Sequence, residues 1–261
     1  MKPYKFKKII FNDGILNDSV DATYIIHLEN NGRYNHICQQ LSEYHPTNLV
    51  YILFNKGYKK SKKKSFINKT CLDLVDAFLE VFKHSEQQNY NNILILEDDF
   101  IFNKKIKETE HKNNINNNIL DLYNKDFIYY LGTVPFLIFP TGLFNKVIPG
   151  GGAHAIVYSK LYRNKILGLD QQEIIDWDHL VISNSIKYLN SYIYNIPLCY
   201  QIFPETENSK TTNILIKFII KLTNLNKKPE PGFSFFYFSS KFLFWFIIFI
   251  IIILINKLVI R

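Results

Sequence analysis

The sequence predicts an α/β fold, in which a mostly parallel sheet carries helices on both faces and a hydrophobic helix follows at the carboxyl terminus. Short runs of β-branched and aromatic residues alternate with segments of helical periodicity, a pattern typical of parallel strands joined by right-handed crossovers. The run Ile93–Leu96 has no polar side chain, as expected of a strand buried on both faces. The longer apolar run Phe242–Ile255 indicates the terminal helix.

The first two predicted strands flank a short helix. Asp21–Leu28 (DATYIIHL) is rich in β-forming residues and ends in a polar segment, so we expect the first core strand there. Arg33–Tyr44 has apolar residues four positions apart, which predicts a helix that ends before Pro46. Asn48–Phe54 (NLVYILF) is the second predicted strand.

A second helix leads to the third strand. Thr70, with Asp73 three residues later, resembles a capping box, and an apolar helix face then continues to about His84. The polar turn Asn89–Asn92 separates this helix from the strand Ile93–Leu96. The first half of the chain is therefore predicted to be β-α-β-α-β.

Shorter elements are predicted after the third strand. The expected strands are Phe127–Leu131, Ala153–Ser159 and Ser191–Ile196, and the expected helices are Ile115–Tyr123, Lys160–Leu167, Asp176–Leu189 and the amphipathic Thr211–Leu225. We expect short strands and turns over Gly132–Lys146, a loop over Leu198–Ser209 and a hinge at Pro229–Gly232. We divide the chain into one α/β domain at 1–228 with a core at about 21–209, a hinge and lead-in at 229–241, and an anchor helix with a short tail at 242–261.

Composition and charge narrow the class of protein. Hydrophobic residues make up 47% of the chain, which excludes a disordered protein, and the formal net charge is +8. Much of this charge lies in Lys59–Lys64 (KKSKKK), which is typical of a solvated loop and also suits a diphosphate ligand or an anionic membrane surface. The run has no interleaved aromatic residues, so nucleic-acid binding is not expected. Cys38, Cys71 and Cys199 are too far apart to indicate a disulfide framework or a zinc site.

Phe242–Ile255 (FLFWFIIFIIIILI) has no polar face, which excludes an amphipathic surface helix. As a helix it spans only ~21 Å of the ~30 Å hydrocarbon core, and Phe233–Ser240 closes the gap if Lys241 reaches the interface. We therefore expect a single-pass carboxyl-terminal membrane anchor; a buried or oligomer-forming helix is the alternative. The amino terminus, MKPYKFKKII, lacks the apolar core of a secretory signal, so we expect the soluble domain in the cytosol.

Three acidic residues follow the third strand. Glu97 and Asp99 leave a strand on the same side, and Asp98 leaves it on the other side. Ligands of open α/β sheets bind at the carboxyl ends of the strands, and carboxylates suit Mg²⁺ or Mn²⁺ bound together with a phosphate. The cluster therefore suggests group transfer from a nucleoside diphosphate donor, whereas a solvated turn is the alternative interpretation.

Two further groups are candidates for the same site. Gly150–Gly152 would allow close backbone approach to a bulky ligand, or form a flexible turn. His154 is a candidate ligand or hydrogen-bond donor, or a structural histidine. Asp176 and Asp178 are candidate helix caps, and either one facing the crevice would accept a proton from an attacking hydroxyl.

Six segments, in order, resemble the family 25 glycosyltransferases, which include lipopolysaccharide-type galactosyltransferases and the collagen galactosyltransferases. They are TYIIHLENNGRYNHICQQL, ILILEDDF, YLG, GGAHAIVYSKLYRNKIL, DWDHLV and PLCYQIFPETENS, from about Thr23 to Ser209. The resemblance implies a Rossmann-like GT-A fold, a UDP-sugar donor and Mn²⁺ or Mg²⁺ as cofactor. It also implies inverting transfer of a sugar such as galactose or glucose to a hydroxyl of a glycan, lipid or protein acceptor.

The resemblance also implies roles for individual residues. By position, Asp99 is the first metal ligand, and Glu97 and Asp98 contact the ribose or the metal. The nucleotide-side loop includes Leu28, Glu29 and Arg33, and the donor sugar is lined by Gly151, Gly152 and His154. The base is Asp178 or Asp176. The chain departs from the family at two places. It has His27-Leu28 where the family usually has an Asn-Leu pair, and it has Asn30 and Asn31 where the family has basic residues. The alternatives are an inactive, membrane-anchored binding or surface protein that keeps the fold, and a nucleic-acid enzyme using two metals.

Overall fold

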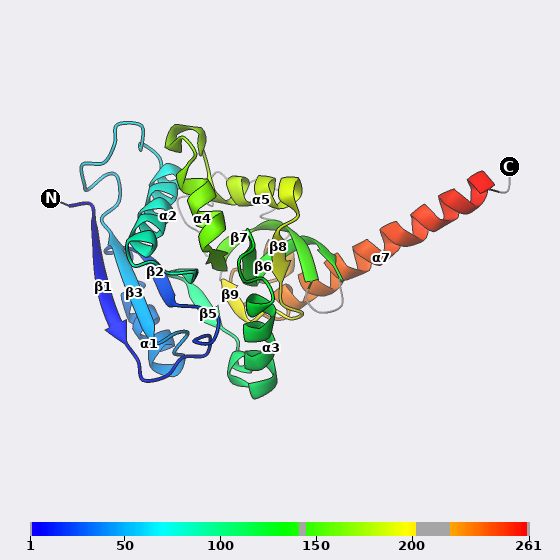
Figure 1. Ribbon diagram of the computed structural model, residues 1–261, viewed down its shortest axis with the longest axis horizontal. Coiled ribbons are helices and arrows are strands. Elements are labelled where there is room, and N and C mark those ends of the chain that lie inside the picture. Colours follow the sequence, from blue (N-terminus) through cyan, green and yellow to red (C-terminus); the bar gives the residue numbers. More distant parts are fainter. Residues whose placement is uncertain (1, 141–144, 202–219, 260–261) are drawn as a thin grey trace.

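The computed structural model describes residues 2–140, 145–201 and 220–259, and its body is a mixed sheet covered by helices on both faces (Figure 1). The strands are β1 (Tyr4–Ile10), β2 (Ala22–Leu28), β3 (Leu49–Asn55), β4 (Asn92–Glu97), β5 (Phe100–Phe102), β6 (Ile128–Phe139), β7 (Asn145–Ser159), β8 (Ser191–Ile193) and β9 (Cys199–Gln201). The helices are α1 (Tyr34–Glu43), α2 (Thr70–Gln87), α3 (Thr109–Leu120), α4 (Lys160–Leu167), α5 (Trp177–Tyr188) and α7 (Gly232–Val259), with 3-10 turns at Lys104–Lys107 and Gln171–Glu173.

The main sheet has the strand order β1-β3-β2-β4-β7-β6-β8, and β5 pairs with β9 in a separate two-stranded sheet. Strands β3, β2 and β4 are parallel neighbours, and β6 is parallel to β8. Because β7 is antiparallel to both β4 and β6, the strands β3, β2, β4, β6 and β8 all run in one direction, whereas β1 and β7 run the other way. The predicted mixed α/β class with a mostly parallel sheet is confirmed for the described residues.

The central strands are buried on both faces because their alternating side chains enter two different cores. Ile93 and Ile95 of β4 pack with α2, α4 and α5 on one face. Leu94 and Leu96 pack with α1 and α3 on the other face. All four side chains are fully buried, so the uninterrupted apolar run of the sequence reflects helices on both faces of the sheet.

Three segments differ from the sequence-based expectation. The amino-terminal residues form the edge strand β1, in which Tyr4 and Phe6 are half-buried while the lysines between and after them are exposed. Within the predicted short strands and turns of Gly132–Lys146, residues 132–139 instead continue β6 and residues 145–146 begin β7. The pairing of these two strands has register shifts around Pro135, which is how it accommodates a residue that cannot donate to a ladder.

The third difference is β9, which occupies Cys199–Gln201 within the predicted loop Leu198–Ser209. Residues 202–209 of that loop, and most of the predicted helix Thr211–Leu225, lie outside the described residues. The predicted helix Ile115–Tyr123 is α3, and it begins six residues earlier, at Thr109.

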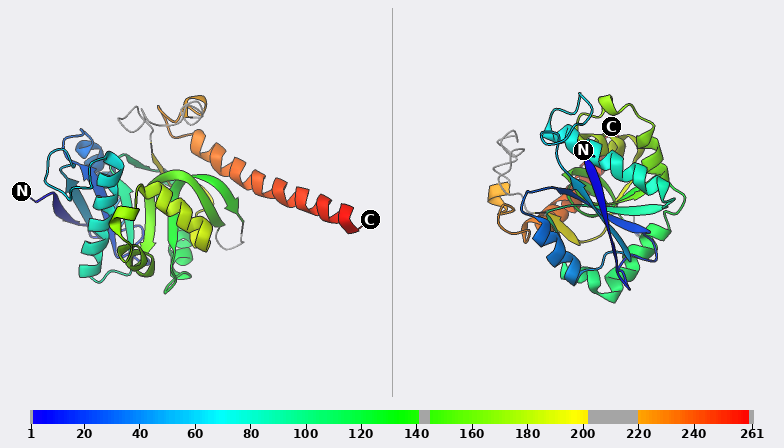
Figure 2. Two further views of the ribbon diagram at one scale, coloured as in Figure 1. Left: turned by 90° about the horizontal axis from the view of Figure 1, so that it is seen from above. Right: turned by 90° about the vertical axis from the view of Figure 1, so that its left-hand side faces the viewer.

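Helix α7 is apolar around its circumference and leaves the body as a single rod (Figure 2). Within Gly232–Leu258, the most apolar window of 18 residues has a mean hydropathy of 2.6, and only 6% of that window is buried. Its first turns belong to the body, because Phe233 and Tyr237 are buried and Ser240 Oγ donates to the Pro135 carbonyl over 2.6 Å. The terminal helix is therefore long and apolar enough to span a membrane, and its base is packed against β6.

Candidate functional site

The acidic triplet Glu97–Asp99 lies where β4 ends and the turn to β5 begins. Asp98 faces the loop between β2 and α1, whereas Glu97 and Asp99 both approach the side chain of Gln201 on β9. This is the division between two sides that strand alternation predicts for three successive residues.

Asp98 anchors the β2–α1 loop, residues 29–33, to the end of β4. Its Oδ2 accepts hydrogen bonds from His27 Nδ1 (2.9 Å), the Leu28 N–H (3.1 Å) and Asn31 Nδ2 (2.6 Å), and its Oδ1 accepts one from an Arg33 guanidinium nitrogen (2.8 Å). Burial raises the pKa of Asp98, but the hydrogen bonds from His27 and Arg33 outweigh burial, and the net shift is downward. Asp98 is therefore an ionised structural carboxylate whose two oxygens are already occupied by protein donors.

Glu97 and Asp99 carry less compensated charge. The same Arg33 nitrogen that binds Asp98 lies 3.1 Å from Asp99 Oδ2. Burial raises the pKa of Asp99 more than Arg33 lowers it, and burial together with the charges of Asp99 and Asp178 raises the pKa of Glu97 well above its usual range. One guanidinium therefore does not balance the buried negative charge of this cluster.

The two candidate bases on α5 have different environments. Asp176 is the N-cap of α5, where its Oδ1 accepts the His179 N–H over 3.0 Å. Asp178 points into the body, and it accepts the Ala153 N–H (3.1 Å) and the Gly152 N–H (3.5 Å). The structure therefore brings Asp178 toward the triplet, and it uses Asp176 to start the helix.

Electrostatics place Asp178 with the triplet as well. Burial raises the pKa of Asp178, and the charge of Asp176 raises it further, against the two backbone donors. The charge of Asp178 in turn raises the pKa of Glu97. Two carboxylates from distant parts of the chain thus share one buried region.

The glycine run positions the backbone that holds Asp178. Gly152 has φ +83°, and a Cβ there would lie 3.2 Å from His154 Nδ1, so both conformation and space favour glycine. The Gly151 carbonyl accepts the Thr133 hydroxyl over 2.7 Å. The run directs two successive N–H groups at Asp178.

His154 lies behind the glycine run and is fully buried. Its Nε2 is 3.3 Å from the Cys199 carbonyl, and its ring packs edge-on against Phe233 of α7. Burial lowers the pKa of His154 to about 4, so the ring is neutral at physiological pH. Among the described residues, its Nδ1 has no hydrogen-bond partner.

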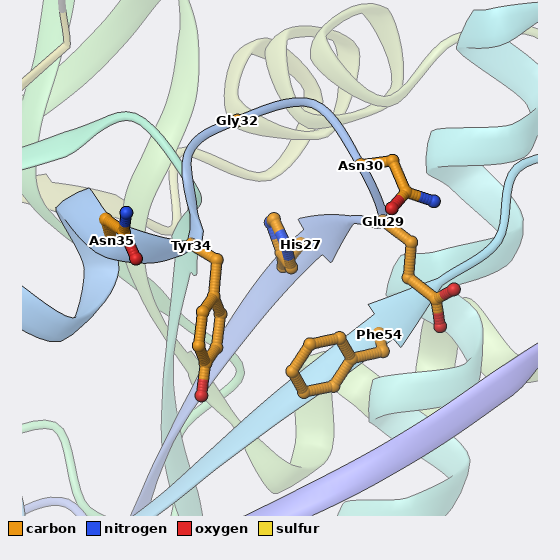
Figure 3. Close-up of a pocket in the computed structure, with 7 residues that line it drawn as sticks. All are labelled: His27, Glu29, Asn30, Gly32, Tyr34, Asn35 and Phe54. Carbon is orange, nitrogen blue, oxygen red and sulfur yellow. The ribbon is translucent and has the colours of Figure 1, made fainter.

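A pocket of about 400 Å³ opens at the carboxyl ends of β2 and β3 (Figure 3). It is lined by His27, Glu29, Asn30, Gly32, Tyr34, Asn35 and Phe54. Figure 3 shows the rings of Tyr34, Phe54 and His27 on the same side of the loop. The Tyr34 and Phe54 ring centroids are 5.6 Å apart, and they lie 5.8 and 5.5 Å from the His27 ring centroid. Because His27 also binds Asp98, one side chain connects the pocket wall to the acidic triplet.

Of the predicted nucleotide-side residues, Glu29 lines this pocket. The Leu28 N–H and the Arg33 guanidinium are turned toward Asp98 instead. The sequence reasoning did not find the aromatic wall or Gln201. In the sequence, Tyr34 indicates only the start of a helix, and Phe54 is one of several apolar residues in a predicted core strand.

No protein-family model and no curated protein matches the chain. Among solved structures, the chain resembles the crystal structure of a glycosyltransferase involved in the glycosylation of the major capsid of PBCV-1. That likeness has a TM-score of 0.35 and 10% sequence identity, and it covers 66% of this chain and 80% of that chain.

Proposed function

We propose that the protein is a glycosyltransferase of the family 25 type, which moves a sugar from a UDP-sugar to a hydroxyl of a glycan, lipid or protein acceptor. The observation that carries the proposal is the arrangement at the carboxyl edge of the sheet. There, a pocket with aromatic walls adjoins a buried group of carboxylates that a single arginine does not neutralise. The flat base of a nucleoside diphosphate would pack against the aromatic walls of the pocket. A cation bound to its diphosphate would supply positive charge to the carboxylates.

The pocket suits the nucleoside end of the donor. Its volume of about 400 Å³ falls within the range of roughly 300–1,000 Å³ that is usual for ligand pockets. The Tyr34 and Phe54 rings offer apolar faces for stacking, and the side chains of Glu29 and Asn35 offer hydrogen-bonding groups for the base or ribose.

Glu97 and Asp99 would hold the Mn²⁺ or Mg²⁺ that the family resemblance implies. They fit such an ion because they are hard oxygen donors with surplus buried negative charge. Within residues 2–140, 145–201 and 220–259 there is no group of three or more His, Cys, Asp or Glu side chains able to hold a metal ion. Waters and diphosphate oxygens would complete the coordination, as is usual for these ions. When bound, the cation supplies charge neutralisation for the departing diphosphate.

Asp178 is the base in this proposal. The acceptor oxygen attacks the anomeric carbon of the donor sugar, its proton passes to Asp178, and the bond from the sugar to the diphosphate breaks on the opposite face. A raised pKa brings the carboxylate closer to the operating pH of a general base. Two backbone N–H groups fix its orientation, and Asp176 remains bound to its helix end.

A paired substitution tests this assignment. We expect Asp178→Asn to reduce Mn²⁺-dependent transfer from UDP-galactose or UDP-glucose by at least about 100-fold, since general bases contribute on the order of 10²–10⁴ in rate. Asp176→Asn is the matched control, because asparagine also caps helices, and its rate should stay within a few-fold of the native rate. Equal loss in both variants, or none in Asp178→Asn, would show that Asp178 is not the base.

The inactive alternative has its own signature. An anchored binding protein would bind UDP in the pocket without turnover of any UDP-sugar, and Tyr34→Ala would weaken that binding. Its motivation is the β2–α1 loop, where Asn30 and Asn31 replace expected charges and Arg33 is held by Asp98 and Asp99.

We also propose that α7 anchors the protein in a membrane with the α/β body in the cytosol. Support for the anchor comes from the length and apolar exterior of α7 and from Lys241 and Lys257, which lie at the two ends of its apolar run. Resistance of the full chain to alkaline carbonate extraction, with the body open to protease on the cytosolic side, is the expected result.

A further inference from the structure

Gln201 is brought to the acidic triplet by strand pairing that the chain forms immediately after Asp99. In the antiparallel pair of β5 and β9, Gln201 is the register partner of Phe100. Asn103 closes this pair, because its N–H donates to the Leu198 carbonyl over 2.9 Å and its side chain donates to the Tyr200 hydroxyl over 2.6 Å. The position of Gln201 is therefore fixed by backbone pairing.

The Gln201 amide nitrogen occupies the place of a bridging cation. Its Nε2 lies 3.1 and 3.2 Å from the two oxygens of Asp99 and 3.4 Å from Oε2 of Glu97. A neutral amide satisfies these oxygens as a donor but does not cancel the charge of an ionised carboxylate. The amide nitrogen thus marks a point that three carboxylate oxygens surround.

We propose that Gln201 is a third protein ligand of the divalent cation, with its amide turned so that Oε1, rather than Nε2, faces the site shared by Glu97 and Asp99. This inference rests on the cation of the proposed function. Amide oxygens are suitable ligands for hard divalent ions, and a half-turn about the terminal bond exchanges the donor end for the acceptor end.

The surroundings of Gln201 Oε1, on the side of the amide away from the carboxylates, favour this rotation of the amide. Gln201 Oε1 and His154 Nδ1 lie 3.7 and 3.2 Å from the point where a Gly152 Cβ would be. His154 Nε2 faces the Cys199 carbonyl, so Nδ1 of the neutral ring is an acceptor, and no described residue supplies its donor. The turn would move the amide N–H group to this side, where a buried acceptor lacks a partner.

The direction in which Gln201→Leu changes the Mn²⁺ affinity shows whether Gln201 is a ligand of the ion or a competitor for the carboxylates. If Gln201 is a ligand, Gln201→Leu removes a coordinating oxygen and weakens Mn²⁺ binding. If its N–H groups only compete with the metal for Glu97 and Asp99, the same substitution removes the competitor and tightens binding.

The test uses the full chain in detergent micelles titrated with Mn²⁺ alone, with the free ion measured by electron paramagnetic resonance. We expect Gln201→Leu to raise the Mn²⁺ Kd by about tenfold or more, since loss of even an outer partner of a metal ligand costs about 10–100-fold. The matched control is Gln171→Leu, because Gln171 also donates its amide to an aspartate, Asp76, over 2.9 Å and lies outside the site; its Kd should not change. Gln201→Glu should tighten binding, with the gain disappearing as the pH falls.

Unchanged or tighter binding in Gln201→Leu overturns the inference, as does the absence of Mn²⁺ binding by the native chain. If Gln201→Leu unfolds, failure of Gln201→Glu to tighten binding overturns it instead. Mn²⁺ binding that depends on Gln201, without transfer from any UDP-sugar, leaves the inference standing and removes the proposed function.

Discussion

Substitution of Asp98 by asparagine should destabilise the fold substantially, because this carboxylate is the anchor of the β2–α1 loop. In the better of its two orientations, the asparagine oxygen keeps the three bonds made by Oδ2 and its amino group faces Arg33. One charge-assisted hydrogen bond is then lost, at about 1.5–3 kcal/mol, and the remaining bonds weaken because their acceptor is neutral. We expect a total loss of about 3 kcal/mol in the free energy of unfolding.

The pH dependence follows from the lowered pKa of Asp98. A carboxyl whose pKa is lower in the folded state contributes stability above its unfolded pKa of about 4, and that contribution is lost as the pH falls through the folded value. The difference in stability between the native chain and Asp98→Asn should therefore be full at pH 7 and shrink as the pH falls below about 4.

Urea unfolding of the full chain in detergent micelles measures this difference. Trp177 is buried against Phe78, with ring centroids 4.2 Å apart, and Trp245→Phe leaves it as the one tryptophan in the chain. The control is Asp13→Asn, because Asp13 also pairs with a histidine, His45, but its side chain is 82% exposed; its unfolding midpoint should not move. Equal midpoints for the native chain and Asp98→Asn at pH 7 would refute the anchoring role.

Three further predictions concern the glycine run, the helix and the cation. Gly152→Ala should lower stability by about 1–3 kcal/mol in the same urea assay, because Gly152 has φ +83°, whereas Gly168→Ala, at φ −80°, should be tolerated. A chain ending after Lys241 should fold and leave the membrane fraction in carbonate extraction, whereas one ending after Lys228 should unfold more readily, since it lacks the buried base of α7. Mn²⁺ should raise the thermal unfolding midpoint more at pH 7.5 than at pH 5.5, because acidic groups with raised pKa values bind protons at the lower pH and must release them to bind the ion. A larger midpoint shift at pH 5.5 would contradict the last prediction.

The sequence was sufficient for the elements whose signal is local. The β-α-β-α-β half was predictable because each strand is a short run of mostly apolar, β-forming residues and each helix has an apolar face. The two sides of the acidic triplet followed from strand alternation alone. The fold class needed no information about contacts between distant parts of the chain.

The elements that sequence reasoning missed depend on distant partners. Strand β1 is an edge strand stabilised by β3, and β5 and β9 have three residues each, too few to carry a periodic pattern. Gln201 was therefore predicted to lie in a loop. The choice between Asp176 and Asp178 was also open, because both stand at a helix start, and only the packing of β7 against α5 shows which carboxylate turns inward.

The base of α7 and the acidic triplet are connected through β9. Glu230, two residues before α7, accepts the Tyr200 hydroxyl over 2.7 Å, and Phe233 packs against the rings of Tyr200 and His154. Tyr200 precedes Gln201 in β9, so contacts from the base of the helix support this strand. The side-chain amide of Gln201 in turn donates to Glu97 and Asp99. The residues that join α7 to the body therefore contact the same strand that carries Gln201 of the candidate site. Loss of the first turns of α7 should then weaken Mn²⁺ binding as well as the fold, whereas loss of the helix beyond Lys241 should affect only membrane attachment.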